Sequence, residues 1–223
     1  MQLLKTSDWH PAIHVLQARI QQELSAGRRV LWLVSGGSNI VATVTIMQGL
    51  VEETTKNLTI MLADERYGAV GHSDSNGAQL LAAGFDPRQA QLLTVLISNT
   101  SFEATRDHYE ALAIKAFSNC DIVIAQFGMG SDGHIAGILP RSAAASSTAF
   151  VAAYAAQPYQ RLTLTFRAIK RVSVAYVLAY GDDKKPALEM LSSKLIPYTE
   201  QPAQIIKELP EAYVFNDQMG EAA

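Results

Sequence analysis

Cysteine and long apolar segments are nearly missing from this chain. Cys120 is the only cysteine among its 223 residues, which excludes an internal disulfide and disfavours a cysteine-based metal site. No window approaches the roughly 18 consecutive apolar residues of a membrane-spanning helix. The first stretch, residues 1–10, has no long apolar core, so we expect no signal peptide. These absences predict a cytoplasmic protein without a membrane partner.

An excess of charge of either sign is missing as well. Charged residues make up 17% of the chain, hydrophobic residues make up 48%, and the formal net charge is −3. This balance gives no electrostatic basis for a nucleic-acid partner, and the hydrophobic content argues against disorder. A chain of this length can bury a core without a disulfide or a metal. We expect one α/β domain over residues 1–223, as a monomer or a small homo-oligomer.

Hydrophobic spacing predicts strands that alternate with helices. One helical face is traced by Trp9, Ile13, Leu16, Ile20 and Leu24. Further helices are expected at 40–50, 101–117 and 183–193. Runs typical of strands lie at 29–34, 57–64, 121–128, 161–166, 173–181 and 212–217. The Ala- and Ser-rich segment 142–158 stays open between a helix and a mobile loop, and the tail, 218–223, is expected to fray.

This alternation predicts an α/β fold with a Rossmann-like, mostly parallel sheet flanked by helices and a small α+β extension. Sheets of this kind bind ligands at the carboxyl ends of their strands. Three polar clusters, SGGSN, DERYG and GMGSDGH, each follow a predicted strand directly. We therefore expect the three clusters to meet at one edge of the sheet.

The first cluster places Gly36 and Gly37 between Ser35 and Ser38. Glycines let the backbone approach a ligand closely, and the N-terminus of the following helix offers unpaired N–H groups. We interpret this turn as a phosphate cradle, although it matches neither the Walker A motif nor GxGxxG. The alternative is a plain turn with a serine N-cap.

The second cluster offers Asp64 and Arg66 at the end of a strand. A guanidinium group can bind a phosphate or a carboxylate through two parallel hydrogen bonds. The carboxylate of Asp64 can accept a proton or a hydrogen bond from a sugar hydroxyl. The alternative is an ion pair at the surface, which would contribute little to stability.

The third cluster places Asp132 and His134 on either side of a glycine. Histidine titrates near neutral pH, which suits a general base, and a neighbouring carboxylate can hold its tautomer. The alternative is a turn that carries a surface histidine. A metal site would need more ligands than this loop supplies, so none is predicted.

In this order, the clusters resemble the motifs of the 6-phosphogluconolactonase family. That family shares a superfamily with glucosamine-6-phosphate deaminases and ribose-5-phosphate isomerases. The matching motifs are SGGS, DER followed by the SN of Ser75 and Asn76, GxGxDGHxAxxxP from Gly128 to Pro140, RxTLT from Arg161, and GxxK ending at Lys184.

The resemblance implies hydrolysis of 6-phospho-D-glucono-1,5-lactone to 6-phosphogluconate in the oxidative pentose phosphate pathway, without a metal or a cofactor. It implies His134 as the base that activates water, with Asp132 beside it. The residues that it implies for binding the substrate and its phosphate are Ser35, Gly36, Gly37, Ser38, Asp64, Arg66, Asn76, Gly130, Arg161 and Lys184.

The chain departs from the family pattern at two places. It reads SGGSNI where lactonases usually read SGGSTP, and DGHIAGILP where they usually read DGHTASLFP, so that Gly137 replaces a serine. The deaminase pattern DGHIAFNEP carries a glutamate that this chain lacks, which favours the lactonase. Another sugar-phosphate isomerase or deaminase, or a non-catalytic sugar-phosphate sensor, remains the alternative.

Overall fold

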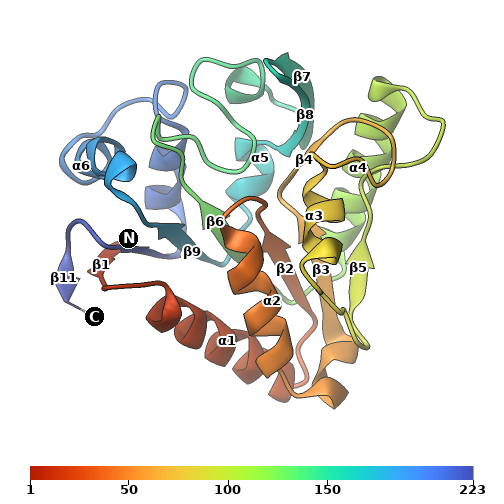
Figure 1. The fold of residues 1–223 in the computed structure, drawn as a ribbon, viewed down its shortest axis with the longest axis horizontal. Helices are drawn as coiled ribbons and strands as arrows, with labels where there is room; N and C mark the ends of the chain where they lie inside the picture. The colour runs from red at the N-terminus through yellow and green to blue at the C-terminus, as the bar shows by residue number, and fades with distance from the viewer. Residues whose placement is uncertain (223) are drawn as a thin grey trace.

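The fold is built on an eight-stranded sheet in which every neighbouring pair of strands is parallel (Figure 1). The computed structural model describes residues 1–222. The strand order is β11-β1-β10-β9-β6-β2-β3-β5. These strands are β1 (Gln2–Lys5), β2 (Val30–Val34), β3 (Leu58–Leu62), β5 (Gln91–Leu93), β6 (Ile122–Gly128), β9 (Val174–Ala179), β10 (Glu211–Asn216) and β11 (Glu221–Ala222).

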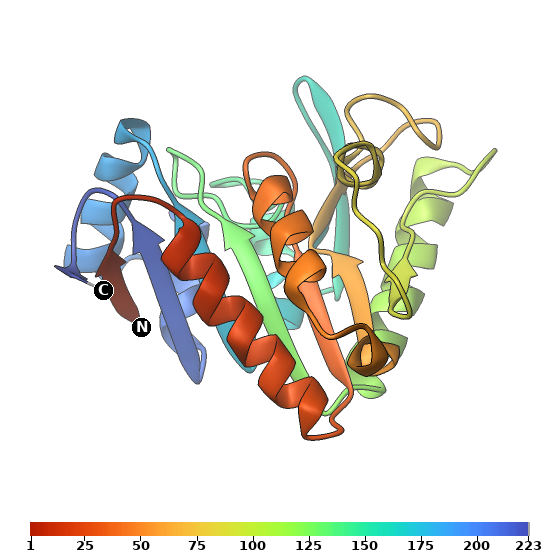
Figure 2. The same cartoon turned by 60° about the horizontal axis from the view of Figure 1, so that its bottom comes forward.

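Helices cover both faces of this sheet. The helices are α1 (His10–Ser25), α2 (Asn39–Gly49), α3 (Asn76–Ala82), α4 (Phe102–Ser118), α5 (Phe166–Ile169) and α6 (Lys185–Ser193). Short 3-10 helices are η1 (Glu52–Asn57), η2 (Ala144–Ser146), η3 (Asp182–Lys184) and η4 (Pro202–Glu208). Figure 2 shows α1 and α2 side by side in front of the sheet and α5 behind it. The predicted fold class, a mostly parallel sheet flanked by helices, is confirmed.

The helix α1 forms where its apolar spacing predicts it. Ile13, Leu16, Ile20 and Leu24 are all buried against the sheet side of the molecule. The carboxylate of Asp8 accepts a hydrogen bond of 2.8 Å from the backbone N–H of His10, at the start of the helix. Gly27 lies just beyond the end with a φ of +75°, a conformation that glycine adopts without strain.

The centre of the sheet is a continuous apolar layer. All five residues of β2 and all six residues of β9 are buried, and Trp32 has no exposed surface. Strands that are buried on both faces read as unbroken apolar runs, which is why the sequence predicts them well. This layer gives the strand ends a rigid base.

A second, antiparallel sheet stands beside the carboxyl end of the first. It has the order β4-β8-β7, with β4 (Asp64–Arg66), β7 (Val151–Ala156) and β8 (Tyr159–Leu164). The chain passes from β3 to β4 through Ala63 alone. The pairing sets Asp64 opposite Thr163 and Arg66 opposite Arg161. This small sheet corresponds to the predicted extension, and it brings two arginines together.

Two expectations from the sequence are wrong. The segment 142–158 is neither a helix nor a loop throughout, because residues 151–156 form β7 and pair with β8 along their whole length. Alanine has little preference for strands, so the pairing partner decides the conformation here. Within the tail, Glu221 and Ala222 do not fray but pair with Leu4 and Lys5 of β1.

The strand order reverses between β2 and β6. From β2 the chain moves outward to β3 and β5, whereas from β6 it moves the opposite way to β9 and β10. A crevice forms outside the carboxyl ends of strands at such a reversal, and open α/β sheets bind ligands there. The SGGSN turn follows β2 and the GMGSDGH loop follows β6, so both lie at the reversal.

Candidate functional site

A cavity of about 190 Å³ lies at this reversal. Its lining residues are Ser35, Gly36, Gly37, Ser38, Asn39, Asp64, Arg66, Asn76, Gly128, Met129, Gly130, His134, Ala136, Arg161 and Lys184. Every residue that the sequence predicts for the site is therefore in the lining except Asp132, and that residue bonds directly to His134. The predicted meeting of the three clusters at one edge is confirmed.

The SGGS turn forms one wall of the cavity. Gly37 has a φ of +63°, and a side chain on Gly36 would overlap the amide of Asn76. Ser38 occupies the N-cap position of α2, but its side chain makes no capping hydrogen bond. Because Ser38 leaves the helix uncapped, the plain-turn alternative loses its main support. The helix α2 begins at Asn39, and both Ser38 and Asn39 line the cavity, so the N-terminus of the helix lies at the strand-end edge, where it favours an anion.

Two arginines from the small sheet form a second wall. The guanidinium carbons of Arg66 and Arg161 lie 5.3 and 5.5 Å from the centre of the Tyr159 ring, so both arginines contact the same aromatic ring. Arg66 also donates a hydrogen bond of 3.0 Å to the carbonyl oxygen of Asp74. Two guanidinium groups held this way favour an anion between them. Tyr159 was not predicted, because its contact with both arginines depends on the pairing of β4 with β8.

Glu65 holds the arginine wall to the start of α3. Its carboxylate is only 2% exposed and accepts four hydrogen bonds. The donors are the backbone N–H groups of Arg66 (2.7 Å), Asn76 (2.6 Å) and Gly77 (2.9 Å) and the hydroxyl of Ser75 (2.9 Å). Burial raises the pKa of Glu65, and these donors oppose that rise. Glu65 was not predicted as a site residue, although it stands between Asp64 and Arg66, which were.

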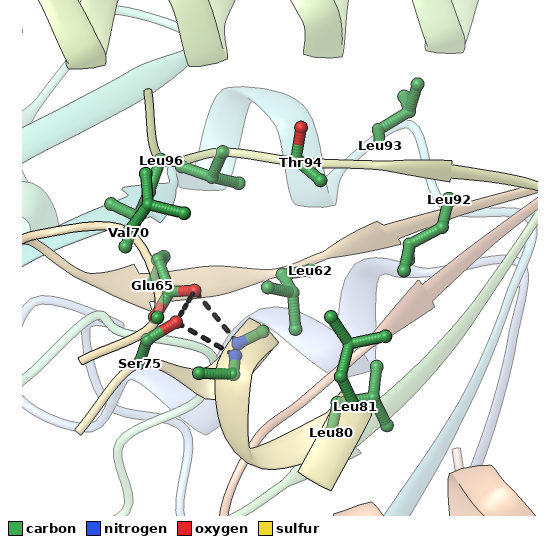
Figure 3. A pocket seen from close by; sticks show the side chains of 14 residues that line it. Leu62, Glu65, Val70, Ser75, Leu80, Leu81, Leu92, Leu93, Thr94 and Leu96 are labelled. Atoms are coloured by element: carbon green, nitrogen blue, oxygen red, sulfur yellow. Dashed lines mark hydrogen bonds between the residues drawn. The ribbon is translucent and has the colours of Figure 1, made fainter. Parts of the chain in front are cut away.

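Behind Glu65 lies a different kind of cavity, of about 130 Å³ (Figure 3). Leu62, Leu80, Leu81 and Leu92 surround it, and the hydrogen bonds from Ser75 and Gly77 to Glu65 close one end. The carboxylate at that end already has its donors. The cavity therefore presents an almost entirely apolar surface, unlike the cavity at the strand ends.

His134 and Asp132 form a bonded pair within their loop. One carboxylate oxygen of Asp132 accepts from Nδ1 of His134 at 2.7 Å and from its backbone N–H at 3.0 Å. Partial burial raises the pKa of Asp132, but these bonds outweigh it and hold the pKa below the ordinary 3.8. The bond at Nδ1 fixes the ring tautomer and leaves Nε2 available. A side chain on Gly130 would overlap the ring, so glycine is needed there.

Asp64 lies beneath the cavity and is 5% exposed. Burial raises its pKa, while the positive charges of Arg66 and Arg161 act against that rise. The side-chain amide of Asn76 donates to the backbone carbonyl of Asp64 at 2.9 Å and to its carboxylate at 3.3 Å. These bonds orient Asn76 so that its own carbonyl oxygen stays unpaired at the cavity.

Lys184 closes the cavity from a separate element, the end of η3 after β9. Its ammonium lies 2.9 Å from the carboxylate of Asp183, and its side chain is 23% exposed. The turn that leads to it begins at Gly181, which has a φ of +112°. This turn adds a third cation to the two arginines of the small sheet.

Gly137 does not leave a gap where the family pattern has serine. A Cβ atom at this position would lie 2.9 Å from the Cβ atoms of both Asp64 and Thr163. The hydroxyl of Thr163 instead accepts a hydrogen bond of 3.0 Å from the backbone N–H of Gly137. Thr163 therefore fills the space that a serine side chain would need.

Unpaired polar atoms gather at the strand-end cavity. Five buried atoms with no hydrogen-bond partner in the described chain belong to its lining residues: Ser35 Oγ, Asn39 Oδ1, Asn76 Oδ1, Arg66 Nε and Arg161 Nε. Buried polar groups are normally paired, and exceptions concentrate where a ligand completes them. This set contains acceptors as well as cationic donors. A ligand that satisfies it carries both an anionic group and hydroxyl groups.

Residues 1–222 contain neither a cluster of metal-ligating side chains nor a helix that could span a membrane. No group of three or more His, Cys, Asp and Glu side chains is placed to hold a metal ion. No helix in that range is long and apolar enough to cross a membrane.

Comparisons with known proteins agree with this geometry. The sequence model of the family described as Glucosamine-6-phosphate isomerases/6-phosphogluconolactonase matches residues 9–214. A 6-phosphogluconolactonase of Neisseria meningitidis serogroup B is 26% identical over 167 residues, which are 70% of this chain and 71% of that protein.

Solved structures share the fold. A 6-phosphogluconolactonase from Thermotoga maritima superposes with a TM-score of 0.82 at 20% identity, covering 96% of this chain and 97% of its own. One from Shewanella baltica superposes with a TM-score of 0.80 at 22% identity, covering 97% of both chains.

Replacing Glu65 with glutamine tests the four hydrogen bonds that its carboxylate accepts. The amide NH₂ of glutamine would face two backbone or hydroxyl donors, so at least one buried donor would lose its acceptor. We expect the Glu65→Gln variant to lose about 1–3 kcal/mol of unfolding free energy in urea denaturation. Glu53→Gln, an exposed change in η1, is the control and should be neutral. Equal unfolding free energies of the two variants would show that the hydrogen bonds to Glu65 do not stabilise the junction between β4 and α3.

Replacing Gly137 with serine tests why the family residue is absent. The new Cβ would press on Asp64 and Thr163, and overpacking of this kind costs about 1–3 kcal/mol. We expect a lower midpoint of thermal unfolding for Gly137→Ser than for Ala111→Ser, which adds the same hydroxyl on the exposed side of α4. A Gly137→Ser variant as stable as the wild type would contradict the close packing described above.

Proposed function

Because the chain belongs to the family of glucosamine-6-phosphate isomerases and 6-phosphogluconolactonases, we propose that it hydrolyses 6-phospho-D-glucono-1,5-lactone to 6-phosphogluconate, a step of the oxidative pentose phosphate pathway. One observation carries the proposal. A histidine with a fixed tautomer and three cations line the same cavity of about 190 Å³. That combination suits a substrate with a phosphate at one end and a hydrolysable ester at the other.

The cations and the SGGS turn bind the phosphate in this proposal. Arg66 and Arg161 supply planar donor groups that match phosphate oxygens, and Lys184 adds a point charge. The N–H groups at the start of α2 complete the binding, since a helix N-terminus favours an anion. Binding the phosphate fixes the position of the lactone ring, which contributes to the rate by orientation.

His134 acts as the general base. Its Nε2 removes a proton from a water molecule, and the water oxygen attacks the lactone carbonyl carbon. The tetrahedral intermediate collapses by breaking the bond to the ring oxygen, which takes the proton back from Nε2 of His134 and becomes a hydroxyl. The products are the open-chain acid and a regenerated histidine. Neither metal nor cofactor is needed to balance this reaction.

Asp132 supports the base without touching the substrate. Its carboxylate accepts from Nδ1, so it keeps Nε2 unprotonated and stabilises the charged ring that forms when the proton is taken. Because the pKa of Asp132 lies below the ordinary 3.8, its carboxylate is ionised at neutral pH. The pair thus performs the same task as the aspartate and histidine of a hydrolytic triad, with water in place of the serine.

The hydrolysis of the lactone by wild type and His134→Ala tests this proposal. The lactone is generated in the assay and its opening is measured above the spontaneous rate. We expect wild type to accelerate opening, and His134→Ala to lower kcat by about 10²–10⁴-fold, the usual contribution of a general base, with KM little changed. His108→Ala, a change on α4 away from the cavity, should retain full activity.

Two results would contradict the proposal in different ways. If folded wild type does not accelerate opening, the reaction is wrong, and amino-sugar and pentose phosphates become the substrates to test. If His134→Ala retains the wild-type kcat, the reaction stands but the base is a different group.

A further inference from the structure

Asn39 lines the strand-end cavity but was not predicted as a site residue. It is the first residue of α2, directly after the SGGS turn, and it stands where the family pattern has threonine. Asn39 is buried, with only 3% of its surface exposed. A buried asparagine at the strand-order reversal, between the ends of β2 and β6, needs an explanation in terms of its hydrogen bonds.

The backbone of Asn39 is held firmly. Its carbonyl oxygen accepts hydrogen bonds of 3.1 Å from the Thr43 hydroxyl and 3.1 Å from the side-chain amide of Gln126. Thr43 also donates to Gln126 at 3.2 Å, and neither residue has exposed surface. This buried network ties the first turn of α2 to β6 and fixes where the Asn39 side chain begins.

The side-chain amide of Asn39 has no such support. Its oxygen is buried without a hydrogen-bond partner among residues 1–222. Leaving a buried polar group unpaired destabilises the folded protein, and an apolar residue of similar size would avoid that cost. The amide therefore fits a role in which a ligand supplies the missing partner.

The position of the amide places it in reach of such a ligand. A Cβ atom on Gly128 would lie 2.6 Å from the amide nitrogen, so the amide packs against the end of β6 in space that only glycine leaves open. Asn39 also lines an adjoining cavity of about 170 Å³, whose far side includes Trp9 and Tyr180. The amide thus stands on the wall that the two cavities share.

The chemistry of the amide selects its partner. A phosphate dianion offers acceptors only, and it is better matched by the arginines and Lys184. A hydroxyl both donates and accepts, so it complements the carbonyl oxygen and the NH₂ of an asparagine alike. We propose that Asn39 hydrogen-bonds a ring hydroxyl of the bound sugar phosphate and thereby selects sugars that carry it. The identity of that sugar as the lactone rests on the proposed function.

The proposed hydrogen bond of Asn39 is tested by combining variants of the protein with analogues of the substrate. The variants are Asn39→Leu, which removes both polar atoms at similar size, and Asn39→Thr, which introduces the family residue. Gln48→Leu, the same type of change at an exposed position of α2, is the control. Each protein is assayed with the lactone and with deoxy analogues that each lack one ring hydroxyl, after its unfolding curve shows that it is folded.

We expect Asn39→Leu to lower kcat/KM for the full lactone by about tenfold, the effect of one lost hydrogen bond, and Gln48→Leu to leave it unchanged. One deoxy analogue should be a poor substrate for wild type. For that analogue, kcat/KM should be no lower with Asn39→Leu than with wild type, because the hydrogen bond is already missing. Asn39→Thr should keep part of the discrimination between analogues. The threonine hydroxyl can still hydrogen-bond the sugar, but the side chain reaches less far than that of asparagine. Equal losses with every analogue would overturn the proposal.

Binding measurements separate this inference from the proposed function. The dissociation constants of 6-phosphogluconate and of other hexose and pentose phosphates are measured by calorimetry for wild type and Asn39→Leu. If wild type binds a sugar phosphate without opening the lactone, the proposed reaction fails, and a weaker binding by Asn39→Leu still supports its role. If both proteins bind every sugar phosphate equally, or neither binds any, the role of Asn39 is refuted.

Discussion

The buried carboxylate of Glu65 is the interaction on which the candidate site most depends. A charged group is stable in such a place only when donors surround it, and here three backbone N–H groups and one hydroxyl do so. Those donors belong to the end of β4 and the start of α3, which carry Arg66 and Asn76. One side chain therefore sets the relative position of a cation and a neutral acceptor that face the same cavity.

The parallel sheet supplies the second constraint. Its strands place their carboxyl ends at one edge, and the reversal of strand order between β2 and β6 opens a crevice there. The apolar layer beneath is packed on both faces, so the turns rest on a rigid base while their own polar atoms stay unpaired. The frame is complete without a ligand, whereas the hydrogen bonding of the cavity is not. That contrast supports the proposal that a ligand binds in this cavity.

Much of the fold and of the candidate site could be predicted from the sequence, and the features that could not be predicted depend on contacts between separate segments. Long apolar runs and turns such as SGGS are local signals. They made it possible to predict β2, α2 and the meeting of the three clusters from the sequence. The strand β7 was not, because its alanines become a strand only by pairing with β8. The contribution of Glu65 depends on donors that lie beyond an intervening loop, at the start of α3, and the backbone of Asn39 is held by Gln126 of β6, which is distant in the sequence. Their only local signal was their position inside two of the polar clusters.

The most direct test of the account is a crystal structure of the protein with 6-phosphogluconate. The account predicts the phosphate between Arg66, Arg161 and the SGGS turn, with Lys184 beside it, and the carboxylate carbon of the product next to Nε2 of His134. Electron density for the product in the reverse orientation would contradict the assignment of the base. Density outside the strand-end cavity would contradict the account as a whole.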